Sequence, residues 1–299
     1  MSQQQLDAVI RDVQACFGAF GPDTTLEQMR ADWDAVSSTP PSTLGAKQTP
    51  VDAGGVRAVW FDAPGAAQDR VVLYLHGGGY VLGGPISHGS MAAQISKSSK
   101  SRVLFVDYRL APEAPFPAAV EDSTAAYKWL LAQGIKPGRI AISGDSAGGG
   151  LCVSTLLSIK QNKLPMPACA APLSPWVDME ALGETMTSKE SVDPIVKKPL
   201  LLGMVSMVVP AGKSVRDPLI APLYGDLSGL PPLLIQVGTR ETLLDDARRL
   251  ADAAKKAGVK VQLHEFEGQI HVFQVFCTRL DEAVEALDEV GAFVQQHTS

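Results

Sequence analysis

Apolar and polar residues follow two alternating patterns from about residue 56 to the end of the chain. Short apolar runs bounded by glycine or proline predict buried strands. Between them, apolar residues recur near every 3.6 positions, as expected for helices. The predicted strands are residues 56–62, 71–76, 103–108, 139–143, 169–173, 233–237 and 259–266. The predicted helices are residues 88–98, 118–133, 148–161, 242–256 and 280–295. This alternation indicates an α/β fold with a mostly parallel central sheet flanked by helices.

Two stretches depart from the alternation. Residues 1–45 contain two amphipathic helical patterns and end in a serine- and proline-rich linker at 37–42. Residues 177–212 lie between two predicted strands and are rich in methionine and leucine. We expect both stretches to form a helical cap over the carboxyl ends of the strands, leaving residues 46–176 and 213–299 as the α/β core. The alternative is that these helices only cover the core.

Composition and charge exclude several classes of protein. A chain of 299 residues with 45% hydrophobic and 19% charged residues can bury one large α/β core. The net charge of -6 and the absence of a lysine and arginine cluster argue against a nucleic-acid surface. The four cysteines are scattered without metal-ligand spacing, which favours free thiols in a reducing, cytoplasmic compartment. The sequence has no signal-peptide pattern and no apolar run of membrane-spanning length.

The segment GDSAG places a serine between a predicted strand and a predicted helix. Ser146 has Gly144 two positions before it and Gly148 two positions after it. This pattern and context are typical of a nucleophile elbow, in which the serine hydroxyl points out of the sheet and the glycines avoid collisions with neighbouring elements. A glycine-rich turn with a purely conformational role is the alternative. The assignment of Ser146 as a nucleophile therefore depends on its partners.

A second glycine-rich loop, HGGGYVLGG at residues 76–84, comes at the end of the predicted strand 71–76. Consecutive glycines leave backbone N–H groups accessible, so those of Gly78 and Gly79 can converge with that of Ala147 on an oxyanion. Neither glycine pattern that binds nucleotides fits this loop, which argues against phosphate binding. His76 precedes the glycines and is predicted to hold the loop rather than to act as a base.

A serine hydroxyl needs a general base before it can attack a carbonyl. Among the five histidines, His271 is favoured because it follows the last predicted strand and produces the chain order serine, acid, histidine. His88 is predicted to begin a surface helix and His264 to lie within a strand. His297 lies close to the carboxyl terminus.

A carboxylate must hold the histidine in the correct tautomer and stabilise its cation. Glu241 is the first carboxylate after the predicted strand 233–237, in a loop that should face His271. Asp245 and Asp246 come about one turn later, where they would stabilise the amino end of a helix. We therefore favour Glu241 as the acid, with Asp245 as the alternative.

Taken together, these motifs resemble the hormone-sensitive-lipase-like esterases, a bacterial branch of the α/β-hydrolase fold. The resemblance runs from HGGGYVLGG through DYRLAPEAPFPAAVEDSTAAYKWL and GDSAGGG to DPLIAPLYGDLSGLPPLLIQVG and GQIHVFQVF. It implies an α/β-hydrolase fold with a helical cap. Many relatives have aspartate and proline where this chain has Glu241 and Thr242. The residues implied as nucleophile, base and oxyanion hole are Ser146, His271, and Gly78 with Gly79 and Ala147.

The resemblance implies a serine carboxylesterase. Ser146 would attack an ester carbonyl, His271 would pass its proton to the leaving alcohol, and water would hydrolyse the acyl-enzyme. The methionine-bearing cap predicts an acyl pocket for short to medium chains. An arylamide deacetylase or amidase would share every catalytic residue. A third interpretation is a ligand-binding receptor on the same fold, against which His271 argues. The chemistry needs no metal, no cofactor and no partner beyond a small ester, and the sequence leaves a homodimer open.

Overall fold

The computed structural model describes residues 2–21, 23–38 and 44–298, so residues 39–42 of the predicted linker lie outside it. Within the described ranges, eight strands form one sheet in the order β1-β2-β4-β3-β5-β6-β7-β8. β2 pairs antiparallel with β1 and β4, and the pairs from β4 to β8 are parallel. The predicted mostly parallel sheet is confirmed. The strands are β1 Lys47–Asp52, β2 Arg57–Asp62, β3 Ala67–Leu75, β4 Ser101–Val106, β5 Ile140–Asp145, β6 Cys169–Leu173, β7 Leu233–Gly238 and β8 Val261–Phe266.

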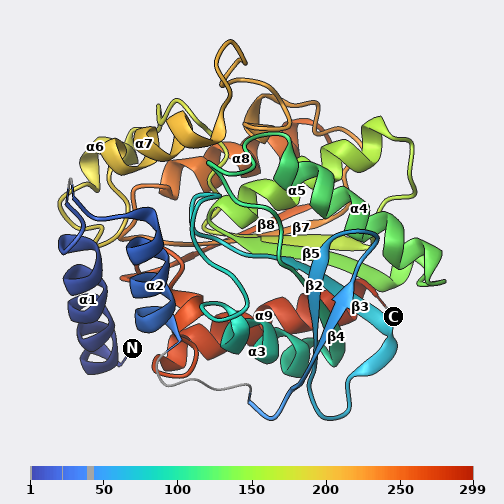
Figure 1. Ribbon diagram of the computed structural model, residues 1–299. Helices are drawn as coiled ribbons and strands as arrows, with labels where there is room; N and C mark the ends of the chain where they lie inside the picture. Colours follow the sequence, from blue (N-terminus) through green and yellow to red (C-terminus); the bar gives the residue numbers. More distant parts are fainter. Residues whose placement is uncertain (1, 22, 39–43, 299) are drawn as a thin grey trace.

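Helices cover both faces of this sheet (Figure 1). Helices α4, α5 and α8 lie on one face, and α3 and α9 lie on the other. None of the helices in the described ranges combines the length and apolar character that crossing a bilayer requires. The helices are α1 Gln3–Gly18, α2 Leu26–Ser37, α3 Gly89–Ser99, α4 Ala118–Ala132, α5 Ala147–Gln161, α6 Thr185–Ser188, α7 Lys198–Val208, α8 Leu244–Lys256 and α9 Asp281–His297.

Strand β1 was not predicted, because its sequence KQTPVD has no apolar run and contains a proline. Pro50 lies opposite Val59 of β2 in the antiparallel register. Proline lacks an N–H donor and is therefore tolerated on an edge strand, whose outer side pairs with nothing. β1 occupies such an edge, and its side chains are half-buried or exposed in alternation.

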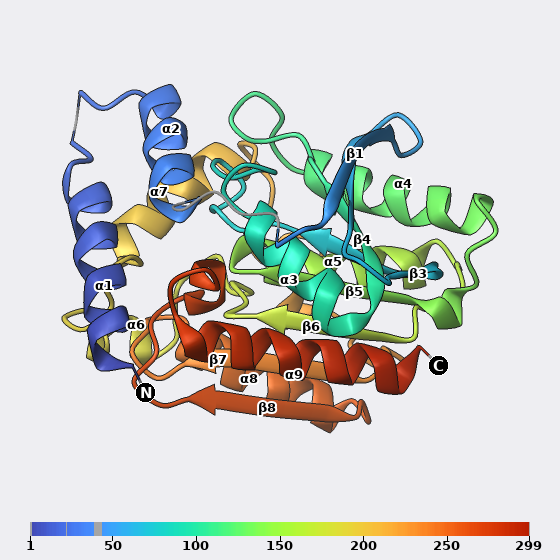
Figure 2. The ribbon, with the colours of Figure 1, turned by 90° about the horizontal axis from the view of Figure 1, so that it is seen from below.

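Helix α3 is largely buried, so the prediction of a surface helix beginning at His88 is wrong. The helix packs against β2, β4 and α9 (Figure 2), and His88, its N-cap, is itself fully buried. Helix α9 comes very close, since a Cβ atom on Gly291 would lie 2.4 Å from the backbone of Ser98. The small residues of α3 allow α9 to pack this closely. The polar character of the α3 sequence did not reveal this packing.

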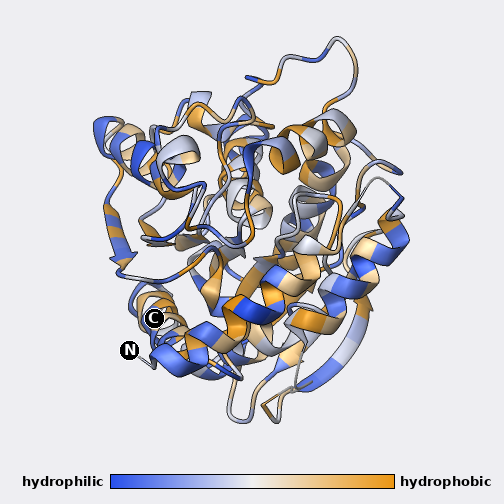
Figure 3. Cartoon of the chain, turned by 90° about the vertical axis from the view of Figure 1, so that its left-hand side faces the viewer, coloured by the Kyte–Doolittle hydropathy of each residue, from blue (hydrophilic) through white to orange (hydrophobic). Residues whose placement is uncertain are grey.

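The amino-terminal helices α1 and α2 lie beside α6 and α7 at one end of the sheet (Figure 1). Helix α1 is amphipathic, with Leu6, Val9 and Val13 fully buried. Figure 3 shows hydrophobic and hydrophilic residues mixed along the helix that begins at the N-terminal label. Arg30 of α2 donates a hydrogen bond to the carbonyl oxygen of Val81 at 2.8 Å. Helix α2 is therefore docked on the loop that follows β3.

Candidate active site

Ser146 lies in a sharp turn between β5 and α5. Its backbone has φ 54° and ψ -121°, a conformation that is uncommon for residues other than glycine. A Cβ atom would lie 2.5 Å from the carbonyl oxygen of Leu75 at Gly144, and 2.0 Å from the same oxygen at Gly148. Only glycine fits these two positions without displacing β3. The turn therefore has the geometry expected of a nucleophile elbow.

His271 reaches the serine from the loop after β8. Its Nε2 atom lies 2.9 Å from the Oγ atom of Ser146, and its Nδ1 atom lies 3.3 Å from Oε1 of Glu241. A Cβ atom on Gly238 would lie 2.3 Å from the carbonyl oxygen of Gln269. Glycine at the end of β7 thus allows the histidine loop to approach the loop that carries the glutamate.

The carboxylate of Glu241 is fully buried and held on the side away from the histidine. Its Oε2 atom accepts hydrogen bonds from the hydroxyl of Ser174 at 2.8 Å and from the N–H of Gly238 at 3.2 Å. The Ser174 hydroxyl also accepts the N–H of Val272 at 3.2 Å. Ser174 therefore links the acid to the histidine loop. Its role was not predicted, because it follows β6 and comes near Glu241 only in the folded chain.

The alternative acid, Asp245, lies in the first turn of α8. It accepts the N–H of Thr185 at 3.1 Å, and its neighbour Asp246 accepts the N–H of Val177 at 2.9 Å. Both carboxylates thus hold the 177–212 segment against the amino end of α8. The geometry favours Glu241 over Asp245 as the partner of the histidine.

Opposing effects act on the pKa of His271. Burial lowers its pKa, whereas the charge of Glu241 and the hydrogen bond to it raise it, with further contributions from Asp193 and Asp145. The net result is a pKa above the usual value of histidine. A neutral imidazole is the form that accepts a proton from serine, so a base at this position would lose function as the pH falls through the raised pKa.

The glycine loop after β3 presents free backbone donors beside the serine. Gly78 and Gly79 have φ values of 107° and 63°, and their N–H groups donate to no protein group in the described part of the chain. Ala147 is the first residue of α5, so its N–H has no acceptor within the helix. Three N–H groups and the positive end of the helix dipole are therefore available for an oxyanion.

A buried polar cluster around Asp145 holds this loop in place. Asp145 accepts hydrogen bonds from the Tyr74 hydroxyl at 2.5 Å and from the Gly77 N–H at 3.0 Å. The Nε2 atom of His88 lies 3.3 Å from its other oxygen. Burial raises the pKa of Asp145, but His88 and the hydrogen bonds outweigh it, and the net pKa is lowered. The Asp145 carboxylate thus holds Gly77, the first glycine of the loop, next to the chain segment that carries Ser146. The sequence pointed to this role of Asp145 only through its position directly before Ser146 in GDSAG.

His76, His264 and His297 take no part in the contacts that join Ser146, His271 and Glu241. His76 stacks on Tyr108 with ring centroids 4.2 Å apart, and burial lowers its pKa to about 3, so its ring stays neutral. It packs under the glycine loop, in keeping with the predicted structural role. His264 is half-exposed on β8, 2.9 Å from Glu289, and His297 bonds to the backbone within the last turn of α9.

An apolar cavity of about 50 Å³ lies over the serine, and we call it the serine cavity. Both predicted cap segments contribute to its walls. Met204 packs directly on the glycine loop, since a Cβ atom on Gly79 would lie 2.1 Å from its sulfur. An alkyl group bound at Ser146 would therefore meet hydrocarbon. The cap residues in the wall are Phe17 of α1, Trp33 of α2, and Ile195, Val196, Leu200, Leu201 and Met204.

Comparison with known proteins agrees with this geometry. A family model for the α/β hydrolase fold matches residues 72–275. An acetyl-hydrolase of Streptomyces hygroscopicus is 42% identical over 248 residues, covering 83% of this chain and 82% of that protein. A crystal structure of an esterase from the bacterial hormone-sensitive lipase family is 44% identical, with a TM-score of 0.96 over 99% of both chains. Another, of the esterase EstE5 soaked with p-nitrophenyl butyrate, is 40% identical, with a TM-score of 0.92 over 98% of both chains.

The chain therefore belongs to the α/β-hydrolase family, in its hormone-sensitive-lipase-like branch of carboxylic ester hydrolases. The family resemblance and the hydrolase class predicted from the sequence are confirmed.

Proposed function

We propose that this chain is a serine carboxylesterase that hydrolyses short- to medium-chain acyl esters through an acyl-enzyme intermediate. The observation that carries the proposal is the 2.9 Å contact between Ser146 Oγ and His271 Nε2. Glu241 at the other ring nitrogen completes the relationship of nucleophile, base and orienting acid that serine hydrolases use. The apolar walls of the serine cavity support an alkyl or acyl substrate.

The reaction follows from the proton positions. His271 takes the hydroxyl proton of Ser146 as the oxygen attacks the ester carbonyl, and the N–H groups of Gly78, Gly79 and Ala147 bind the resulting oxyanion. When the tetrahedral intermediate collapses, the imidazolium gives its proton to the leaving alcohol. Water then attacks the acyl-enzyme with the same base, which releases the acid and restores the serine.

A p-nitrophenyl alkylphosphonate tests the proposal, because an activated serine displaces its p-nitrophenolate and keeps the phosphonyl group. We expect one phosphonyl group per chain on the peptide that contains Ser146, and loss of ester hydrolysis in proportion to labelling. Peptide mass spectrometry identifies the site. Labelling at another residue, or full labelling with retained hydrolysis, would contradict the proposal. Comparing a phenyl ester with the matching anilide separates an esterase from an arylamide deacetylase.

We further propose that residues 1–45 and 177–212 form a cap that shapes the substrate range. Phe17 and Trp33 line the serine cavity from the amino-terminal helices, so removing residues 1–40 should change the ratio of kcat/KM between octanoate and acetate esters. A change of about tenfold is expected, the scale of apolar contacts in a binding pocket. Solubility should fall, because apolar surface becomes exposed.

Circular dichroism should show that the sheet survives this truncation. Loss of the sheet signal would show that the helices belong to the core. An unchanged ratio between long and short esters would show that they line no substrate pocket.

A further inference from the structure

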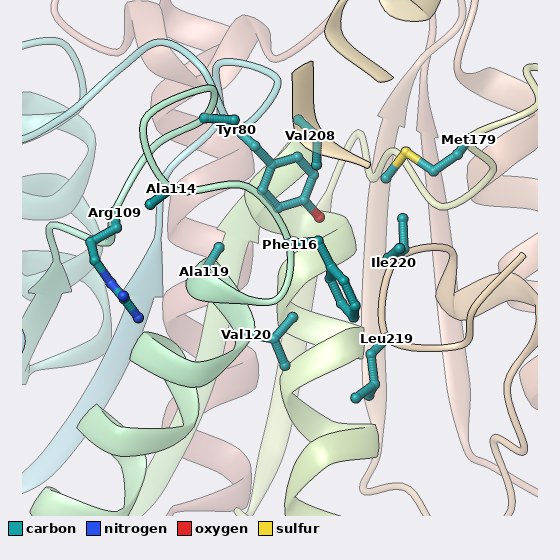
Figure 4. A pocket seen from close by; sticks show the side chains of 11 residues that line it. Tyr80, Arg109, Ala114, Phe116, Ala119, Val120, Met179, Val208, Leu219 and Ile220 are labelled. Carbon is teal, nitrogen blue, oxygen red and sulfur yellow. The ribbon is translucent and has the colours of Figure 1, made fainter. Parts of the chain in front are cut away.

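Figure 4 shows the residues that line a second cavity, whose volume is about 20 Å³. We call it the Tyr80 cavity. Phe116, Met179 and Val208 contribute to its apolar walls, and Tyr80 and Arg109 are the lining side chains with hydrogen-bonding groups. Its volume exceeds the roughly 10–15 Å³ needed to hold one water-sized group. The Tyr80 cavity can therefore receive a small group, such as the end of a chain.

The two cavities adjoin along the same elements. Gly79 and Met204 line the serine cavity, whereas the next residue, Tyr80, and the residue one helical turn along α7, Val208, line the second cavity. The ring centroid of Tyr80 lies 6.2 Å from that of Trp176, which belongs to the serine cavity. The Tyr80 ring thus lines the second cavity and packs against Trp176 in the wall of the serine cavity.

Among the described residues, the hydroxyl of Tyr80 has no hydrogen-bond partner. The residue itself is 6% exposed. In Figure 4 the hydroxyl end of the ring points into the cavity, on the side of Phe116 and Ile220. Burial raises the pKa of Tyr80, so the hydroxyl keeps its proton and can donate. The Tyr80 donor is therefore available to an acceptor that enters the cavity.

Among the described residues, the Arg109 guanidinium and the other tyrosine hydroxyls all have protein partners. The guanidinium of Arg109 turns away from the cavity (Figure 4) and bonds to Asp122 at 2.7 Å. The chain has five tyrosines, and Tyr80 alone lacks a partner among the described residues. The hydroxyls of Tyr74, Tyr108, Tyr127 and Tyr224 donate respectively to Asp145, the carbonyl of His76, the carbonyl of Pro165, and Asp178.

The order of strands places the Tyr80 cavity on the acyl side of the serine. Ser146 follows β5, and His271 follows β8 at one edge of the sheet. The leaving alcohol must lie near His271 to receive its proton. Tyr80 follows β3, on the opposite side of β5, so the part of the ester that extends from Ser146 toward it is the acyl group.

We propose that the Tyr80 cavity binds the oxygen-bearing end of an acyl group and that the Tyr80 hydroxyl donates a hydrogen bond to this oxygen. The substrate class is then esters whose acyl chain carries an ether, keto or hydroxyl oxygen beyond the ester carbonyl. Tyr80 is a specificity-determining residue in this assignment. The inference rests on the proposed serine esterase function.

Pairs of p-nitrophenyl esters test this inference. Each pair has an unbranched acyl chain and its analogue in which one methylene is replaced by an ether oxygen, with the oxygen moved along the chain through the series. The preference is the ratio of kcat/KM within a pair, measured for the parent protein and for Tyr80→Phe. Electronic effects of the oxygen on ester reactivity are the same for both enzymes and cancel in the comparison. At one oxygen position, the parent should exceed Tyr80→Phe by about tenfold.

Two further variants define the site. Val208→Phe should also remove the preference, because its side chain fills the Tyr80 cavity. Tyr127→Phe is the matched control, since it removes a tyrosine hydroxyl that bonds to the carbonyl of Pro165 and lines neither cavity. It should keep the preference of the parent.

Equal preferences in the parent and Tyr80→Phe at every oxygen position would overturn the inference and leave the hydroxyl to a bound water only. A preference that survives in Val208→Phe would overturn it as well. Phosphonate labelling of Ser146 distinguishes these failures from failure of the proposed function. If Ser146 is labelled and the preferences are equal, only the role of the Tyr80 cavity is wrong.

Discussion

Replacing Ser146 by alanine is expected to lower kcat for p-nitrophenyl ester hydrolysis by about 10⁶, the scale measured when the nucleophile of another serine hydrolase is removed. The reason is that no other hydroxyl in the site contacts His271 Nε2, whose partner in the described structure is the serine Oγ at 2.9 Å. Alanine keeps the Cβ atom of the elbow, so the fold should persist. Steady-state kinetics measure the effect, and circular dichroism checks the fold.

Ser154→Ala is the matched control for this experiment. Ser154 is fully buried in α5, and its hydroxyl has no hydrogen-bond partner among the described residues. Its removal should leave kcat within about twofold and cost less than about 1 kcal/mol of stability, since no hydrogen bond is lost. A Ser146→Ala protein that retained activity within about tenfold of the parent would exclude Ser146 as the nucleophile.

Replacing Glu241 by glutamine is expected to lower kcat by about 10⁴, as the equivalent carboxylate-to-amide change does in another serine hydrolase. The hydrogen bonds around Glu241 explain the direction. Ser174 and Gly238 both donate to Oε2, so the amide oxygen of glutamine takes this place and its NH₂ group faces His271 Nδ1. Nδ1 must then accept, and the ring proton moves to Nε2. Nε2 can no longer take the proton of Ser146.

The pH profile provides a second measurement on the same variant. In the parent, the pKa of His271 is raised by Glu241 against the effect of burial, and activity is lost as the pH falls through that pKa. In Glu241→Gln the negative charge that raises the pKa of His271 is absent, so the effect of burial, which lowers this pKa, is opposed less strongly. The acidic limb of kcat/KM should therefore move to lower pH in Glu241→Gln.

Asp245→Asn is the control for the acid. Asp245 caps the 177–212 segment through the N–H of Thr185 and lies in the first turn of α8. The substitution should cost about 0.3–1 kcal/mol of stability, the scale of a charge at a helix terminus, with little change in rate. If Asp245→Asn were nearly inactive and Glu241→Gln close to the parent, the assignment of the acid would be wrong.

Much of the candidate site was predictable because its signals are local in the chain. The elbow needs glycine two positions before and two positions after Ser146, and both glycines can be read directly from the segment GDSAG. The free N–H groups of Gly78 and Gly79 follow from consecutive glycines after a strand. His271 and Glu241 were found by their places after the last two predicted strands, since the carboxyl ends of parallel strands meet at one edge of the sheet.

Predictions failed where the relevant contacts join distant parts of the chain. His88 begins a helix of small and polar residues, which suggested a surface position. In the structure this helix packs against α9, which lies almost two hundred positions later in the sequence. The hydrogen bond between Gln94 of α3 and Asp288 of α9 joins the two helices. The sequence of β1 does not by itself indicate a strand. β1 forms a strand because it pairs with β2.

The sequence by itself determined the fold class, which is confirmed, and it predicted the nucleophile elbow, the glycine loop and the order of serine, acid and histidine, because each depends on residue spacing and strand periodicity. Only the tertiary structure shows that Glu241, and not Asp245, contacts His271, since both follow the same strand and differ in which loop faces them. It alone brought Ser174 to the acid and Asp145 to the glycine loop. It also left the Tyr80 hydroxyl without a partner among the described residues, because burial and partners depend on how distant segments pack together.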